Sequence, residues 1–181
     1  MTYEEARAQF PVLERYAYLQ AGSVGPLARG TIEAMRAAEE DGLANGRGSI
    51  AQFTRLVEER EALRAEIAAL VGVPAESVAL TASTTDGCNV VLAGLGLGPD
   101  DEVITTTDEH FGLIGPLHMS RAKVVVVAPD SDRIAAAVTS RTRLIAISHV
   151  LWTTGAILPV HGLREVKIGR ASCRERVCND V

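Results

Sequence analysis

The apolar residues of this chain follow two different patterns. Between Phe53 and Val71 they recur at intervals of three and four residues, which places them on one face of a helix that ends before Gly72 and Pro74. Beyond Pro74, short apolar runs typical of strands are separated by stretches typical of helices. These patterns predict strands at 77–81, 102–106, 123–128 and 143–148, and helices at 86–95, 112–120 and 131–138.

The alternation of strands and helices defines the expected fold class. Strands joined by helices pair in parallel, and the helices then cover the faces of the sheet. The run of valines within 123–128 fits a strand that is buried on both faces. We therefore expect an α/β fold with a mostly parallel sheet, preceded by an N-terminal segment with helices at 3–16 and 31–43.

Composition and charge narrow the possible functions. The net charge of −5 argues against a nucleic-acid-binding surface, and no apolar run reaches the length needed to cross a bilayer. The first ten residues are polar and acidic rather than typical of a signal peptide, so we expect a cytoplasmic protein. The three cysteines, two of them near the C-terminus, form no disulfide framework, and no metal site is expected.

The last residues differ from the rest of the chain. Residues 167–181 read KIGRASCRERVCNDV, which is basic, has no apolar period and contains two of the three cysteines. This run resembles the translation of a common sequencing-library adapter, and we interpret it as a non-native tail. The expected organisation is therefore an N-terminal segment over residues 1–50, a partial large domain over 51–166 and this tail over 167–181.

One segment combines a strand, a turn of small hydroxyl residues and the start of a helix. It reads VALTASTTDGCNVVL over residues 78–92, with Thr84 and Thr85 at the turn. The free N–H groups and the dipole at such a helix terminus favour a phosphate dianion, and two hydroxyls add further donors. Ordinary N-capping also explains a threonine at this point, although it needs only one. Taken alone, the segment favours the capping interpretation.

A histidine after the next strand strengthens the phosphate interpretation. His110 follows the predicted strand 102–106, and ligands of open α/β sheets bind where strands end. We therefore expect Thr84, Thr85 and His110 at the same edge of the sheet. A histidine there can lie flat on a planar aromatic cofactor, whereas a lone histidine is more commonly an ordinary surface-loop residue.

A third segment, after the strand 143–148, brings further side chains to that edge. It reads ISHVLWTTGAILPV over residues 147–160 and contains Trp152, which is the only tryptophan, followed by Thr153. Simple packing and a role in a site are equally good explanations of Trp152.

The order of these motifs resembles a known family. A loop with the pattern GxxGP, then STTDGCN, DEVITTTDEH and TRLIAISHVLWTTGAILPV, is similar to aminotransferase class V, the fold-type-I family of pyridoxal-phosphate (PLP) enzymes that includes cysteine desulfurases. The wording GCNVVL and SHVLWTTG is most similar to the branch of cysteine/cystine lyases and isopenicillin N epimerase-like proteins. The resemblance implies an incomplete three-layer α/β/α large domain of the fold-type-I enzymes.

The same resemblance implies roles for individual residues. Thr84 and Thr85 would bind the PLP phosphate, and His110 would stack on the pyridine ring. Trp152 and Thr153 would lie beside the phenolic oxygen of the cofactor. Many desulfurases carry an asparagine where this chain has Trp152, so Thr153 is the candidate for the contact with the phenolic oxygen. The substrate carboxylate would lie near the loop formed by Gln20, Ala21 and Gly22.

The resemblance also implies what this chain does not contain. Members of the family carry a Schiff-base lysine in an HK motif and an aspartate in a DGAQ motif, and neither motif occurs here. We therefore expect a truncated, inactive piece of a homodimeric enzyme that acts on cysteine or cystine through a PLP aldimine, as a C–S lyase or desulfurase. An aminotransferase or epimerase of the same fold is the alternative. A third reading, of another class, is an α/β domain that binds a phosphorylated ligand without PLP.

Overall fold

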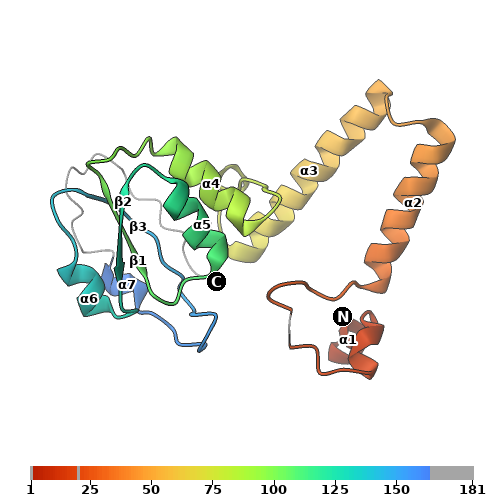
Figure 1. Cartoon of the computed structure of the whole chain (residues 1–181). Coiled ribbons are helices and arrows are strands. Elements are labelled where there is room, and N and C mark those ends of the chain that lie inside the picture. Colours follow the sequence, from red (N-terminus) through yellow and green to blue (C-terminus); the bar gives the residue numbers. More distant parts are fainter. Residues whose placement is uncertain (1, 20, 164–181) are drawn as a thin grey trace. The chain divides into compact units, whose positions relative to one another are not determined.

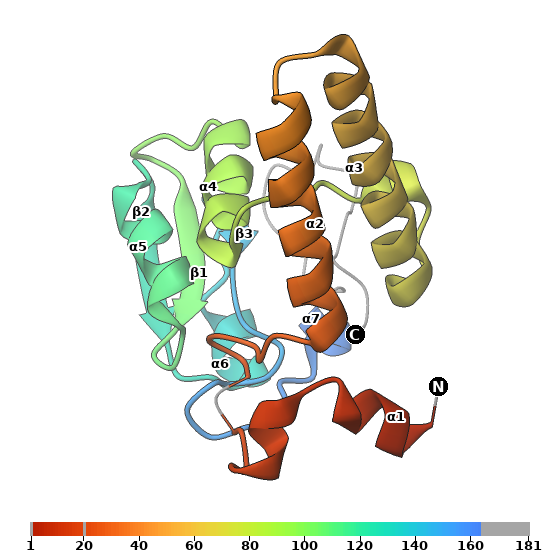
Figure 2. The ribbon, with the colours of Figure 1, turned by 90° about the vertical axis from the view of Figure 1, so that its right-hand side faces the viewer.

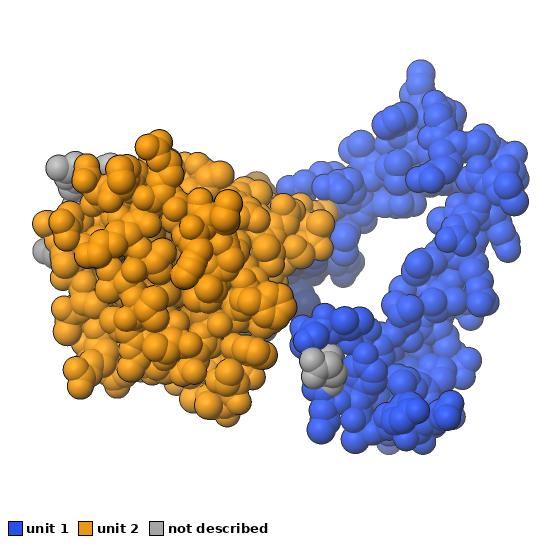
Figure 3. Space-filling model, viewed as in Figure 1, with its two compact units in different colours: residues 1–70 blue, residues 71–181 orange. Residues whose placement is uncertain are grey.

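The computed structural model describes residues 2–19 and 21–163, and the predicted tail over 167–181 lies outside them. The chain divides into two compact units, residues 1–70 and residues 71–181 (Figure 3). Within the described residues, no helix combines the length and the apolar character needed to cross a membrane.

The first unit is helical. It contains α1 (Tyr3–Ala8), the 3₁₀ turn η1 (Pro11–Glu14), α2 (Arg29–Asn45) and most of α3 (Ile50–Val71) (Figure 1). The prediction of one helix over 3–16 was wrong, because Pro11 has no N–H to donate and disfavours helical backbone at the residue before it. The apolar face predicted for the third helix is exposed along most of α3, at Phe53, Leu56, Val57, Leu63 and Leu70.

The second unit is an α/β layer structure around a parallel sheet. Its elements are η2 (Ala75–Ser77), α4 (Thr84–Gly94), β1 (Glu102–Thr106), α5 (Phe111–Met119), β2 (Lys123–Val127), α6 (Ser131–Ala136), β3 (Thr142–Ile145) and α7 (Val160–Leu163). The strand order is β2–β1–β3, with β1 parallel to both neighbours. The predicted α/β class and mostly parallel sheet are thus confirmed.

The strand predicted at 77–81 is wrong. Residues 75–77 form a 3₁₀ turn, and residues 78–82 belong to no strand. The apolar run is compatible with a strand, but a strand forms only where a neighbour completes its hydrogen bonds. In the described residues the sheet contains β1, β2 and β3 alone, and the run pairs with none of them.

The core of this unit lies between the sheet and two helices. Val103 of β1 packs with Leu92, Leu97 and Leu117, which come from α4, the loop after it and α5. Figures 1 and 2 show α4 and α5 side by side, and both helices begin near the carboxyl end of β1. This packing fixes the two helix N-termini at one edge of the sheet, where the candidate site lies.

Candidate functional site

The N-terminus of α4 is capped by Ser83. The Ser83 side chain accepts a hydrogen bond from the Asp86 N–H at 3.1 Å, and the Asp86 carboxylate accepts one from the Ala82 N–H at 3.2 Å. Because Ser83 and Asp86 complete the cap between them, Thr84 and Thr85 are not needed for it. The capping explanation of the two threonines is therefore removed.

Thr84 and Thr85 occupy the first two positions of α4 and are exposed. No hydrogen bond within residues 2–19 and 21–163 uses their backbone N–H groups or their hydroxyls. Two N–H groups and two hydroxyls thus remain at the positive end of the helix dipole. This set of donors fits a phosphate group.

Gly112 brings the start of α5 close to the start of α4. A Cβ at Gly112 would stand 2.9 Å from the hydroxyl oxygen of Thr85 and 3.1 Å from Nδ1 of His110. The Thr85 hydroxyl and the His110 ring therefore both border the same small space, which a glycine leaves open. The structure places these two predicted site residues together, as the order of strands and helices indicates.

His110 is the N-cap residue of α5 and follows β1 after a short turn. Its Nδ1 accepts a hydrogen bond from the Gly112 N–H at 3.0 Å. Since an accepting nitrogen carries no proton, the other ring nitrogen, Nε2, carries it in the neutral imidazole. The His110 ring centroid lies 3.9 Å from that of Phe111 and 5.1 Å from that of Trp152, with the Trp152 ring nearly perpendicular at 84°.

Trp152 and Thr153 lie near the tip of a narrow hairpin. The hairpin is held by the bridge between Val150 and Ile157 and by a hydrogen bond from the Leu158 N–H to the His149 carbonyl at 2.8 Å. Trp152 is 60% exposed although its ring contacts His110. The contact with His110 brings Trp152 to the edge that holds Thr85. Thr153 is exposed beside it.

Glu109 is a residue that sequence reasoning missed. Its carboxylate is buried and accepts hydrogen bonds from the Thr106 hydroxyl at 2.9 Å, the Ser148 N–H at 2.9 Å and the Ser148 hydroxyl at 2.6 Å. The available signal was an acidic residue directly before His110 in a segment where buried strands end. That signal is weak, because the same position is usually a solvated turn.

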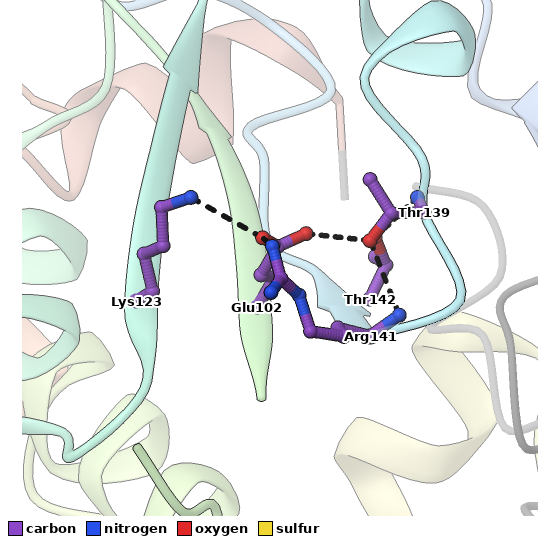
Figure 4. A network of polar contacts seen from close by, with 5 residues as sticks. All are labelled: Glu102, Lys123, Thr139, Arg141 and Thr142. Atoms are coloured by element: carbon purple, nitrogen blue, oxygen red, sulfur yellow. Dashed lines mark hydrogen bonds and ion pairs between the residues drawn. The ribbon is translucent and has the colours of Figure 1, made fainter. Parts of the chain in front are cut away.

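Lys123 is the only lysine among the described residues, and it lies at the edge of the sheet opposite to the candidate site. Lys123 is the first residue of β2 and forms an ion pair with Glu102 at 3.3 Å (Figure 4). Glu102 is 3% exposed and also contacts Thr139 and Arg141, each at 2.6 Å. The hydrogen bond from Thr139, followed by those from Arg141 and Lys123, lowers the pKa of Glu102 to about 2. Lys123 is thus held by an amino-edge network and is not available to the candidate site.

Cys88 and the acidic and histidine side chains of the described residues indicate no additional nucleophile or metal site. Burial raises the pKa of the Cys88 thiol in the second turn of α4, so the thiol is protonated at neutral pH. In the described part of the chain, no cluster of three or more histidine, cysteine, aspartate or glutamate side chains could hold a metal ion.

The predicted substrate-side residues belong to the first unit. Gln20 lies outside the described residues, and Ala21 and Gly22 are exposed in a turn. The Tyr18 hydroxyl donates a hydrogen bond to the Val24 carbonyl at 2.7 Å, which spans this turn. The role of Gln20, Ala21 and Gly22 toward a substrate carboxylate stays a prediction.

Comparison with known proteins agrees with the resemblance seen in the sequence. The Aminotransferase class-V family matches residues 17–170, and the chain belongs to this family. It is 26% identical to a probable cysteine desulfurase of Methanothermobacter thermautotrophicus, over 88% of this chain and 42% of the relative. It is 30% identical to the cysteine desulfurase CsdA of Escherichia coli, over 82% of this chain and 41% of the relative. The chain therefore spans less than half the length of these relatives.

Solved structures of C-DES are similar to this chain. A C-DES mutant with glycine covalently linked to the PLP cofactor superposes with a TM-score of 0.82 at 28% identity, over 91% of this chain and 46% of that one. The cystine C–S lyase C-DES in complex with its reaction product, cysteine persulfide, superposes with a TM-score of 0.79 at 29% identity, over 87% of this chain and 45% of that one. The predicted fold-type-I relationship and the partial domain are confirmed.

Proposed function

We propose that this chain supplies the phosphate-binding and ring-binding part of a PLP site in an enzyme that cleaves the C–S bond of cysteine or cystine. The observation that carries the proposal is the set of four donors on Thr84 and Thr85 that have no partner among the described residues, with the Thr85 hydroxyl beside the His110 ring. Membership of the class-V family and the similarity to C-DES with its bound PLP support the same assignment.

The residues present fit the cofactor in charge and in shape. The N–H groups and hydroxyls of Thr84 and Thr85 would hold the phosphate, because the positive end of α4 favours a dianion. The missing Cβ at Gly112 leaves room between the Thr85 hydroxyl and the His110 ring. His110 would lie against the pyridine ring, with Trp152 and Thr153 beside it. When bound, PLP supplies an electron sink for the carbanion chemistry of amino acids.

Cysteine or cystine is the proposed substrate class. The relatives from Methanothermobacter thermautotrophicus and Escherichia coli are described as cysteine desulfurases, and C-DES acts on cystine. Lys123 is paired with Glu102 at the far edge of the sheet, and Lys167 begins the run that we interpret as a non-native tail. We therefore propose that the lysine which attaches PLP comes from sequence beyond this chain. This chain would then bind PLP without attaching it and would release no sulfide from cysteine. An aminotransferase or epimerase would use the same phosphate and ring contacts.

The binding experiment compares PLP with pyridoxal, which lacks the phosphate. Quenching of Trp152 fluorescence reports binding, since Trp152 is the only tryptophan and contacts His110. We expect PLP to bind more tightly than pyridoxal, and the substitutions Thr84→Val and Thr85→Val each to weaken PLP by about tenfold or more, the value of a hydrogen bond to a charged group. Thr54→Val, on an exposed face of α3, is the matched control.

Three results would each contradict part of the proposal. Equal affinity for PLP and pyridoxal would show that the α4 N-terminus does not bind the phosphate. Equal affinity for PLP and inorganic phosphate would show that the ring adds nothing, which favours a domain for phosphorylated ligands in general. Release of sulfide from cysteine above the rate of free PLP would refute the assignment of the attaching lysine to another segment.

A further inference from the structure

Glu109 joins the two segments that carry the aromatic side chains of the site. Its Oε1 accepts from the Thr106 hydroxyl and the Ser148 N–H, and its Oε2 accepts from the Ser148 hydroxyl. Thr106 ends β1, whereas Ser148 belongs to the segment that follows β3. One carboxylate therefore links the ends of two parallel strands through three hydrogen bonds of 2.6–2.9 Å.

The two linked segments lead directly to His110 and Trp152. His110 follows Glu109 in the chain, and the hairpin that carries Trp152 begins at His149, directly after Ser148. Within residues 71–163, the hydrogen bonds that side chains make between these two segments are the two from Ser148 to Glu109. These two bonds therefore join the segments whose rings, those of His110 and Trp152, lie 5.1 Å apart at an angle of 84°.

The carboxylate of Glu109 is buried without a positively charged partner among the described residues. Glu109 is 7% exposed, and its described partners are neutral N–H and O–H groups rather than a lysine or an arginine. Burying a carboxylate without a cation costs free energy even when it is hydrogen-bonded. A carboxylate nevertheless offers two acceptor oxygens in one plane, and both contact Ser148, which fixes the orientation of that residue as well as its position.

We propose that Glu109 is a positioning residue of the site, which holds Ser148 with both carboxylate oxygens and thereby fixes the His110 ring against Trp152. The benefit to a cofactor rests on the proposed function, because only a planar ring that stacks on His110 would gain from it. A ring held in advance loses less freedom when its ligand binds, which increases affinity.

The experiment measures the near-ultraviolet circular dichroism of the full chain without cofactor. The signal of Trp152, the only tryptophan, reports how rigidly its ring is held. We expect Glu109→Ala to lose most of this signal. Glu109→Gln should keep it, because the amide oxygen accepts from Thr106 and from the Ser148 N–H while the amide NH₂ donates to the Ser148 hydroxyl. Asp108→Asn, one residue away, is the control for the change in charge and should leave the signal unaltered.

Amide exchange at Ser148 gives a second readout. The Ser148 N–H donates to Glu109, so Glu109→Ala should accelerate its exchange by about tenfold or more. Should Glu109→Ala fail to fold, Ser148→Ala decides the question, since it removes the 2.6 Å hydroxyl contact but keeps the N–H donor. A folded Glu109→Ala chain, or failing that a Ser148→Ala chain, with an unchanged Trp152 signal would overturn the proposal.

Ligand binding separates this proposal from the proposed function. Glu109→Ala should weaken PLP several-fold but leave the affinity for inorganic phosphate unchanged, because phosphate contacts only the α4 N-terminus. Equal weakening of both ligands would mean that the site has collapsed as a whole, and a positioning role would then be refuted. A chain that binds no PLP, but whose Trp152 signal still depends on Glu109, would refute the proposed function and leave the link between Glu109 and the two rings intact.

Discussion

Replacing Gly112 by alanine tests how closely the two helix N-termini approach each other. The new Cβ would stand 2.9 Å from the Thr85 hydroxyl and 3.1 Å from Nδ1 of His110, and real Cβ atoms essentially never come closer than 3.0 Å to another heavy atom. Either Thr85 must rotate away or the start of α5 must shift. A shift of α5 would lengthen the 3.0 Å hydrogen bond from the Gly112 N–H to His110.

The magnitude follows from two opposing effects on the free energy of unfolding. Alanine favours helical backbone over glycine by about 1 kcal/mol in a helix interior, and less near the first turn. Crowding a packed position costs about 1–3 kcal/mol. Because Gly112 is buried and lies against two side chains, the crowding should dominate, which gives a net loss of about 1–2 kcal/mol.

Urea denaturation of the full chain measures this loss, and titration with PLP measures its effect on the site. Gly87→Ala in α4 is the matched control, because its Cβ would meet the Thr81 hydroxyl oxygen at an ordinary 3.7 Å. We expect Gly87→Ala to stabilise by about 0.5–1 kcal/mol. Gly112→Ala should destabilise and weaken PLP by about tenfold, since it moves the Thr85 hydroxyl. A Gly112→Ala chain as stable as Gly87→Ala, with unchanged PLP affinity, would refute the reasoning.

Three further predictions concern residues that stabilise the second unit. The pKa of Glu102 is lowered to about 2 from an ordinary 4.5, so its contribution to stability is complete above pH 4.5 and is lost as the pH falls toward 2. Glu102→Gln should remove that part of the dependence of the urea midpoint on pH, and a midpoint that falls as steeply as before would contradict the prediction. Ser83→Ala should cost about 1 kcal/mol through loss of the α4 cap, whereas Ser83→Gly should cost only a few tenths. Gly155 has a φ of 73°, so Gly155→Ala should cost about 1–2 kcal/mol and Gly155→Asn less, as measured by thermal unfolding.

The strands of the sheet could be predicted because their signal is local. The runs at 102–106 and 123–128 are apolar, and turn residues bound them, so periodicity alone located β1 and β2 to within a residue. The run at 77–81 has the same local pattern but no neighbour to pair with, and pairing is not visible in one segment. Pro11 explains why the helix predicted at 3–16 is interrupted, since a proline ends the regular helix that the apolar pattern suggested. The strand predicted at 143–148 is also shorter than expected, because β3 ends at Ile145.

The parts of the candidate site that follow from the order of strands and helices could be predicted from the sequence. The parts that depend on side-chain geometry could not. Parallel strands end at one edge, and this rule brings Thr85 and His110 together. The cap could not be assigned from sequence, because any of the hydroxyls in STT can accept the first free N–H, and the structure selects Ser83. Glu109 was missed because two of its three hydrogen bonds come from Ser148, which is distant in the sequence.

The two ends of β1 carry different kinds of buried carboxylate, which leads to a last prediction. Glu102 at the amino end is compensated by Lys123 and Arg141, as suits a group that stabilises the fold. Glu109, after the carboxyl end, has neutral N–H and O–H partners in the described chain. The strand between them spans about 13 Å, at 3.3 Å per residue.

Mutations at the two ends should therefore be independent. In a double-mutant cycle, the effects of Glu102→Gln and Glu109→Ala on the urea midpoint should add, because the two groups share no partner. Glu109→Ala and Ser148→Ala remove the same 2.6 Å contact, so the second should add little once the first is present. Strong coupling between Glu102 and Glu109, or full additivity between Glu109 and Ser148, would show that the carboxyl-edge contacts do not act as the separate unit that their geometry indicates.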